Sequence, residues 1–200
     1  MSQAPEPFAS FVRAMTHLTD AASSEADILP GGRRLLGAMV ADDNWLPEDF
    51  AWPDPAGYRQ YLLYREPRAR FSVVSFVWGP GQGTPIHDHT VWGLVGVLRG
   101  AELSQRFHVP DAGGPVALGR ANRLATGAVE VVSPTVGDVH RVANAYDDRV
   151  SISIHVYGAD IGAVQRWVYP PEGGRKAFVS GYDNTAANPP FSVELTESAA

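Results

Sequence analysis

The stretch that decides the fold of this chain is residues 84–93, which read Thr84-Pro85-Ile86-His87-Asp88-His89-Thr90-Val91-Trp92-Gly93. It follows a glycine-rich turn and is expected to be extended. Side chains alternate faces along a strand, so His87 and His89 share one face, roughly 6.5–7 Å apart, while Asp88 points away. Two imidazoles at this spacing can converge on one metal ion.

A third histidine, His140, begins another predicted strand further along the chain. The two histidine-bearing stretches match both halves of the cupin pattern, in order, with one extra residue between the proline and the glycine of the second half. The matching positions are Gly81, His87, His89 and Gly100 in the first half, and Pro134, Gly137, His140 and Asn144 in the second. The chain therefore resembles the cupin superfamily.

The expected metal site departs from the usual cupin pattern at one ligand. Cupins often carry a glutamate four residues after the second histidine, where this chain has Gly93. Three neutral imidazoles suit Fe(II), Zn(II), Cu(II) or Ni(II), and they leave coordination positions open on one side for a substrate and O₂. Asp138 is a candidate to support the site from outside. Glu102 is expected to face solvent instead of serving as a fourth ligand.

The pattern of apolar and turn residues around these motifs predicts an all-β fold, a cupin jelly-roll β-barrel with N-terminal helices. Apolar residues recur at helical spacing near Phe8–Leu18 and again after a break at Pro30-Gly31-Gly32. One domain is expected, with residues 1–60 mainly helical, 61–182 forming the barrel and 183–200 a C-terminal tail. Short β-rich runs separated by turn residues predict strands at 70–78, 84–89, 92–99, 102–108, 129–133, 139–144, 150–157, 165–169 and 176–180.

The composition limits the classes of partner. The 200 residues carry a net charge of −6 without a lysine–arginine cluster, which disfavours nucleic acid. The absence of cysteine excludes disulfides, thiolate ligands and a cysteine nucleophile. No stretch predicts a membrane span or a secretory signal, so we expect a cytoplasmic protein. It is expected to be a monomer or a weak homo-oligomer.

A second constellation lies in the apolar run 150–157. Ser153, His155 and Tyr157 alternate with Ile152, Ile154 and Val156, and strand geometry places the three polar residues on one face. Polar side chains are costly to bury unless they bond one another. A hydrogen-bond chain from Ser153 through His155 to Tyr157 is therefore predicted, with a satisfied core network or a solvent-facing strand as the alternatives.

The combination of the 84–93 stretch, His140 and this row is similar to the cysteine dioxygenase family, and within it to the bacterial branch that acts on 3-mercaptopropionate. The resemblance implies Fe(II) held by His87, His89 and His140, and O₂-dependent conversion of a small thiol to a sulfinic acid. It also implies catalytic roles for Tyr157, His155 and Ser153. The expected partners are a small-molecule thiol and O₂.

Two further positions bear on the thiol. Animal cysteine dioxygenases carry a carboxylate-binding arginine where this chain has Gln60, and a tyrosine-linked cysteine where it has Gly93. The mercaptopropionate-type enzymes resemble this chain in Gln60 and in an arginine that corresponds to Arg166. We therefore expect Arg166 and Gln60 to bind 3-mercaptopropionate. A cysteine dioxygenase, a zinc or nickel cupin that isomerises or hydrolyses its substrate, and a non-catalytic metal- or ligand-binding cupin are the alternatives.

Overall fold

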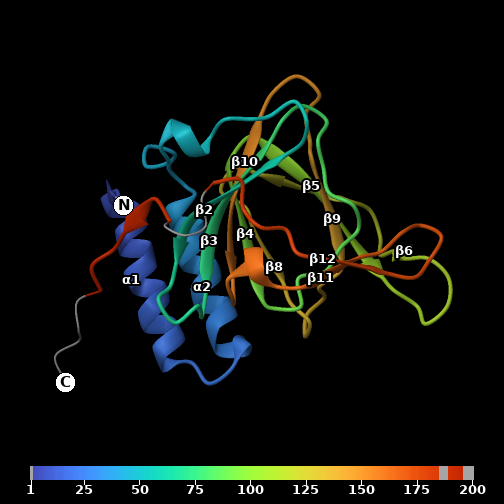
Figure 1. The fold of residues 1–200 in the computed structure, drawn as a ribbon, viewed down its shortest axis with the longest axis horizontal. Coiled ribbons are helices and arrows are strands. Elements are labelled where there is room, and N and C mark those ends of the chain that lie inside the picture. The colour runs from blue at the N-terminus through green and yellow to red at the C-terminus, as the bar shows by residue number, and fades with distance from the viewer. Residues whose placement is uncertain (1, 185–188, 196–200) are drawn as a thin grey trace.

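A barrel of two facing β-sheets makes up most of the computed structural model, which describes residues 2–184 and 189–195. Two helices lie on one side of the barrel, as Figure 1 shows. The predicted all-β cupin barrel with N-terminal helices is confirmed. No helix within the described residues is long and apolar enough to cross a membrane.

The helices are α1 (Glu6–Ala21) and α2 (Glu25–Met39). The predicted break at Pro30-Gly31-Gly32 is wrong, because these residues lie inside α2. Tertiary packing explains why the helix tolerates them: a Cβ atom on Gly32 would lie 2.7 Å from Cδ1 of Leu94, so glycine lets α2 approach the sheet closely. The buried side chains of both helices join one core with the outward face of the sheet.

The first sheet has five antiparallel strands in the order β2-β3-β10-β4-β8. One face, with Val73, Ile152 and Ile154, packs in the same core as the helices. The other face, with Val74 and Tyr157, belongs to a second core inside the barrel. The strands are β2 (Arg59–Arg65), β3 (Ser72–Trp78), β4 (Gly93–Arg99), β8 (Val129–Val132) and β10 (Ser151–Tyr157).

The second sheet is built around β5 (Ala101–His108), which pairs with three strands: β6 (Val116–Ala117), β7 (Asn122–Ala125) and β9 (His140–Asn144). A hairpin of β11 (Arg166–Val168) and β12 (Lys176–Phe178) lies near its end. The predicted strand at 84–89 is not a regular strand. It is an extended segment held by isolated bridges, in which His87 is paired with both His140 and Val168.

The remaining elements are short. They are β1 (Ser2–Gln3), β13 (Phe191–Ser192) and two 3₁₀ turns, η1 (Glu48–Phe50) and η2 (Ile161–Ala163). Part of the predicted tail is ordered, because β13 pairs in parallel with β1 and Phe191 packs on Phe8. Residues 185–188 and 196–200 of that tail lie outside the described residues. The sequence prediction missed β1, β2, β6, β7 and β13.

Candidate active site

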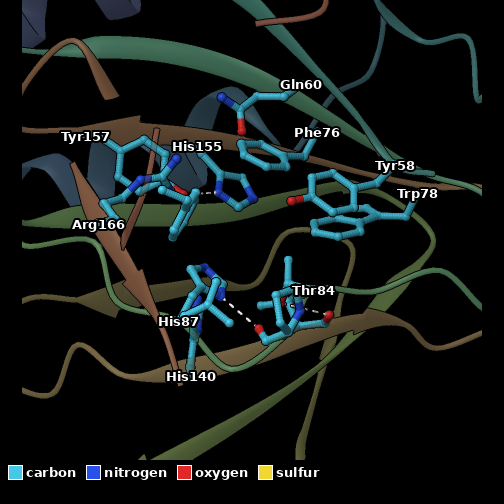
Figure 2. Close-up of a pocket in the computed structure, with 14 residues that line it drawn as sticks. Tyr58, Gln60, Phe76, Trp78, Thr84, His87, His140, His155, Tyr157 and Arg166 are labelled. Carbon is cyan, nitrogen blue, oxygen red and sulfur yellow. Dashed lines mark hydrogen bonds between the residues drawn. The ribbon is translucent and has the colours of Figure 1, made fainter. Parts of the chain in front are cut away.

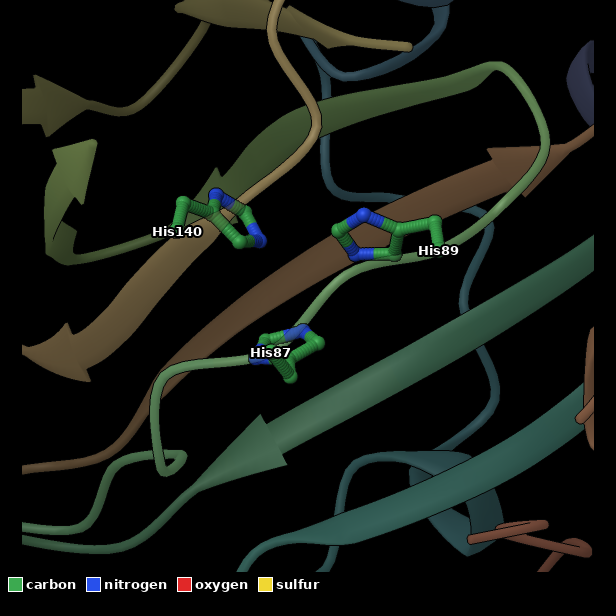
Figure 3. Close-up of side chains that lie close together, drawn as sticks. All are labelled: His87, His89 and His140. Atoms are coloured by element: carbon green, nitrogen blue, oxygen red, sulfur yellow. The ribbon is translucent and has the colours of Figure 1, made fainter. Parts of the chain in front are cut away.

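Three histidines converge inside the barrel, as Figure 3 shows. His87 and His89 come from the segment before β4, and His140 is the first residue of β9. Their ring centroids lie 4.9–5.0 Å apart, and the candidate ligand atoms all lie within 4.8 Å of one another. All three are buried, and within the described residues no carboxylate belongs to this cluster. The structure thus brings the three predicted ligands together.

The second ring nitrogen of two of these histidines has a partner outside the cluster. Nδ1 of His87 lies 3.0 Å from the carbonyl oxygen of Pro85, and Nδ1 of His89 lies 2.8 Å from Oδ1 of Asp138. Both partners are acceptors, so each Nδ1 carries the proton and each Nε2 keeps its lone pair. The Nε2 atom of His89 is buried and has no hydrogen-bond partner. A metal ion is the partner that this geometry fits.

His140 is supported by Glu130, which was not predicted from the sequence. Its Nδ1 atom lies 3.5 Å from Oγ of Ser104 and 3.8 Å from Oε2 of Glu130, and Ser104 donates a 2.5 Å hydrogen bond to Glu130. Burial alone would raise the pKa of Glu130, but the contacts with His140 and Ser104 have the larger combined effect. The net result is a pKa below the ordinary value. The sequence signal that could have revealed Glu130 is the presence of an acidic residue inside the otherwise apolar strand 129–132.

The electrostatics of the cluster favour metal binding. Burial, and then the neighbouring imidazoles, lower the pKa of both His87 and His89 well below the ordinary value. Both rings are therefore neutral at neutral pH, as a metal ligand must be. Asp138 also accepts the backbone N–H groups of His89 and Thr90, and Thr90 has a φ of 61°. This carboxylate thus holds a strained turn beside the ligands.

A cavity of about 220 Å³ opens onto two of the clustered histidines, His87 and His140 (Figure 2). His87, His140, His155, Tyr157 and Arg166 line it, together with Gln60. The rest of its wall is largely aromatic and aliphatic. It includes Tyr58, Phe76, Trp78, Val142, Val168 and Phe178, none of which was singled out as a cavity residue. Such a cavity suits a small, mostly apolar ligand with a few polar groups.

The predicted row on β10 forms a continuous hydrogen-bond chain. Oγ of Ser153 lies 2.8 Å from Nε2 of His155, and Nδ1 of His155 lies 2.7 Å from the hydroxyl of Tyr157. Burial lowers the pKa of His155 well below its usual value and raises that of Tyr157. The chain is therefore neutral at neutral pH, and Tyr157 is its end at the cavity.

Gly93 makes room for Tyr157. A Cβ atom at position 93 would lie 2.9 Å from Cδ1 and Cε1 of the Tyr157 ring and 2.9 Å from Cγ2 of Val132. The chain has no cysteine, so this tyrosine carries no thioether link. The Tyr157 ring instead packs between the backbone of β4 and the ring of His89, with centroids 5.3 Å apart.

Arg166 and Gln60 both reach the cavity wall, from opposite ends of the sequence. Arg166 is only 3% exposed, and burial lowers its pKa. Its Nη2 donates to Oγ of Ser180, its Nε has no partner, and no carboxylate among the described residues forms an ion pair with it. Gln60 donates from Nε2 to Oγ of Ser180 and to the carbonyl of Gly181. Gln60 therefore positions the loop that holds Arg166.

Two further histidines and one glutamate lie outside this site. His17 and His108 are exposed and lie outside the three-histidine cluster. Glu102 is not a member of the cluster either, but the expectation that it faces solvent is wrong, because it is fully buried. Strand alternation turns Leu103 outward and Glu102 into the barrel.

Comparisons with known proteins identify the family of this chain. A family model described as cysteine dioxygenase type I matches residues 2–168. Cysteine dioxygenase type 1 of Rattus norvegicus and that of Mus musculus are each 27% identical over 112 residues, which cover 53% of this chain and 56% of the relative. The match thus spans about half the length of these curated relatives.

A solved structure from Klebsiella pneumoniae, an uncharacterized conserved protein with a double-stranded β-helix domain, is 18% identical with a TM-score of 0.44. The similarity covers 59% of this chain and 91% of that one. The family model covers most of the chain and includes all three clustered histidines and the Ser153–His155–Tyr157 row. The chain belongs to the cysteine dioxygenase type I family.

Proposed function

We propose that this chain is an Fe(II)-dependent thiol dioxygenase that oxidises a small thiol carboxylate with O₂ to the sulfinic acid. The observation that carries the proposal is the cavity, which joins His87 and His140 of the buried three-histidine cluster to the buried Arg166, for which no described residue is an acidic partner. Membership in the cysteine dioxygenase type I family supports the same reaction class.

His87, His89 and His140 would hold the Fe(II) ion, which supplies the redox chemistry that joins both atoms of O₂ to a sulfur. Their neutral rings and the unpartnered Nε2 of His89 fit a divalent ion of this type. The ligand set alone also suits zinc or nickel, so the choice of iron rests on the family.

Arg166 would bind the substrate carboxylate. A buried guanidinium without an acid partner is costly, and an anionic ligand offsets that cost. Arg166 also packs over the ring of Phe178, 4.6 Å from its centroid, which fixes the direction of its donors. Gln60 and Ser180 hold the adjacent loop, so their role is to orient Arg166.

Tyr157 lies beside Arg166 (Figure 2) and would meet the substrate there. His155 and Ser153 fix its hydroxyl, which forms a hydrogen bond to the bound thiol compound or to oxygen as it reacts. The apolar wall excludes water and strengthens these polar contacts.

The lining favours 3-mercaptopropionate over cysteine. The two compounds share a thiol and a carboxylate, but cysteine also carries an ammonium group. None of the described residues that line the cavity is acidic, so an ammonium group would find no countercharge there. Cysteine remains the alternative substrate, because its amine can bind a metal once it has lost its proton.

The test is thiol-dependent O₂ consumption by iron-loaded protein with three thiols. We expect the highest kcat/KM with 3-mercaptopropionate, a lower value with cysteine and the lowest with cysteamine, which lacks the carboxylate. Zinc-loaded protein and the His140→Ala variant are controls without activity. Equal rates with all three thiols would contradict the role of Arg166. No thiol-dependent O₂ consumption by iron-loaded protein would favour a non-catalytic metal- or ligand-binding cupin.

A further inference from the structure

Glu102 is a buried acid for which the proposed reaction has no direct use. It lies on β5, its exposed fraction is 0%, and neither carboxyl oxygen has a partner with hydrogen-bond geometry. A carboxyl group in this setting is costly, so a compensating role is expected. It does not line the cavity, and it is not a member of the histidine cluster.

The Glu102 carboxyl faces the distal end of the hydrogen-bond chain on β10. The Ser153 hydroxyl and the Trp78 indole are the donors that act on this carboxyl, and Trp78 Nε1 also donates to Oγ of Ser153 at 3.1 Å. The titratable groups that act on it or connect to it from other strands are Glu130 on β8 and, through Ser153, His155 and Tyr157 on β10.

The surroundings favour the protonated form of this carboxyl. Burial is the largest effect and raises the pKa of Glu102 to about 8, with a smaller increase from Glu130. The nearby Ser153 and Trp78 donors oppose this increase. At neutral pH the side chain is therefore mostly a neutral acid that can donate a hydrogen bond.

We infer that Glu102 is the fourth member of the chain and that its protonation state sets the direction in which the hydrogen bonds run. The Glu102 carboxyl has no hydrogen bond to the neighbouring Ser153 in the structure, so its participation requires a rotation of the Glu102 side chain toward Ser153. When Glu102 is protonated and turned in this way, it donates to Ser153, Ser153 donates to Nε2 of His155, and Nδ1–H of His155 donates to Tyr157. The hydroxyl proton of Tyr157 then points into the cavity. Tyr157 is in this state a donor to whatever the cavity holds.

When Glu102 is ionised, every bond of the chain reverses. Ser153 donates to the Glu102 carboxylate, Nε2–H of His155 donates to Ser153, and Tyr157 donates to Nδ1 of His155. Tyr157 then presents only lone pairs to the cavity. Glu102 is in this sense a positioning residue that acts through His155.

The proton balance of the reversal is simple. One O–H bond breaks at Tyr157 as its proton leaves into the cavity, and each remaining proton moves one place along the chain. Glu102 ends as the carboxylate, and no other atom changes its charge. The chain can thus deliver one proton to the cavity, or accept one from a thiol there, without exposure of Glu102 to water.

The tautomer of His155 is the direct test, and it can be read without any enzymatic activity. Nitrogen-15 NMR of zinc-substituted protein distinguishes Nδ1–H from Nε2–H imidazole. We expect Nδ1–H at neutral pH and a change to Nε2–H with a midpoint near the Glu102 pKa of about 8. In Glu102→Gln, the tautomer is expected to be independent of pH. Glu172→Gln, at an exposed glutamate, should behave like the unmodified protein.

Two results would overturn the inference. One is that His155 in the unmodified protein keeps a single tautomer from about one and a half pH units below pH 8 to about one and a half pH units above it. The other is an unchanged pH-dependent switch in Glu102→Gln. If Glu102→Gln does not fold, Ser153→Ala replaces it, because loss of the hydroxyl should also make the tautomer independent of Glu102.

The consequence for catalysis rests on the proposed function and has a separate readout. For iron-loaded protein, we expect kcat with 3-mercaptopropionate to change with pH near 8, and we expect Glu102→Gln to lose that change. An NMR switch without any dioxygenase activity would contradict the proposed function alone. Dioxygenase activity in a protein whose His155 tautomer does not change with pH would contradict the role of Glu102 but not the proposed function.

Discussion

The Nδ1 atom of His89 lies 2.8 Å from the Oδ1 atom of Asp138, and the backbone N–H of His89 donates to the same carboxylate. The backbone N–H of Thr90 donates to its other oxygen. One side chain from the segment before β9 thus fixes both the ring and the backbone of a candidate ligand.

Asp138→Asn is expected to weaken metal binding. In the unmodified protein, both Asp138 oxygens accept backbone N–H groups. An amide has only one acceptor oxygen, so in the variant the NH₂ group would face one of these N–H groups and leave it without an acceptor. Loss of such a supporting partner typically lowers metal affinity about 10- to 100-fold. Competition with a chelator measures the affinity, and Asp111→Asn at an exposed aspartate is the control. An unchanged affinity in Asp138→Asn would show that the turn holds His89 unaided.

Tyr157→Phe is expected to keep the metal and lose turnover. The hydroxyl bonds to His155 and faces the cavity but is not in the histidine cluster. A hydrogen bond to a charged group contributes about 1.5–3 kcal/mol, which corresponds to a decrease in kcat of about 10- to 160-fold. Metal analysis and steady-state O₂ consumption separate the two effects, with Tyr146→Phe as the control. Loss of metal from Tyr157→Phe would mean that the tyrosine holds the site together.

Gly93→Ala is expected to displace Tyr157. The added methyl group would lie 2.9 Å from the Tyr157 ring and from Val132, and overpacking of this kind costs about 1–3 kcal/mol. Denaturant unfolding should show this loss, and kcat should fall because the hydroxyl moves away from His155. Gly57→Ala is the matched control, since a Cβ atom there has no neighbour within 4 Å. Normal stability and kcat in Gly93→Ala would refute the packing argument.

Arg166→Lys is expected to raise KM for thiols that carry a carboxylate. Lysine keeps the charge but loses the planar, bidentate donors, so we expect an increase of about tenfold or more. KM for cysteamine, which has no carboxylate, should stay the same. Arg175→Lys is the control, because Arg175 stacks on Trp167 and does not line the cavity. A similar increase for cysteamine would indicate general damage to the cavity.

Glu102 is also expected to make the stability depend on pH. Its folded-state pKa of about 8 lies above the ordinary value of 4.5, so between these two values the folded protein binds more protons than the unfolded chain. Stability from this group therefore decreases as pH rises from about 4.5 to about 8 and is constant above that window. Melting curves of Glu102→Gln should lack this decrease. The same slope in variant and unmodified protein would argue against the raised pKa.

The local parts of the site could be predicted from the sequence. His87 and His89 are neighbours in the chain, and strand alternation on β10 correctly placed Ser153, His155 and Tyr157 on one face. Both patterns depend only on backbone geometry over a few residues, which sequence spacing reports directly.

The parts that depend on long-range packing were less accessible. Gln60 and Ser180 meet 120 positions apart, which no local pattern reports. Glu102 was misplaced because β5 carries its polar residues inside the barrel and Leu103 outside, the reverse of the usual alternation. Pro30-Gly31-Gly32 was taken as a break, but the packing of Gly32 against Leu94 overrides the low helix propensity of these residues.

The central claim is that three imidazoles hold an iron ion beside a small thiol carboxylate and O₂. Reaction of iron-loaded protein with 3-mercaptopropionate under oxygen-18 gas tests it most directly, with mass spectrometry of the product. We expect a sulfinic acid in which both oxygen atoms on sulfur come from O₂, and no product from His87→Ala or His140→Ala. A product with oxygen from water, a disulfide alone, or full activity in either variant would contradict the account.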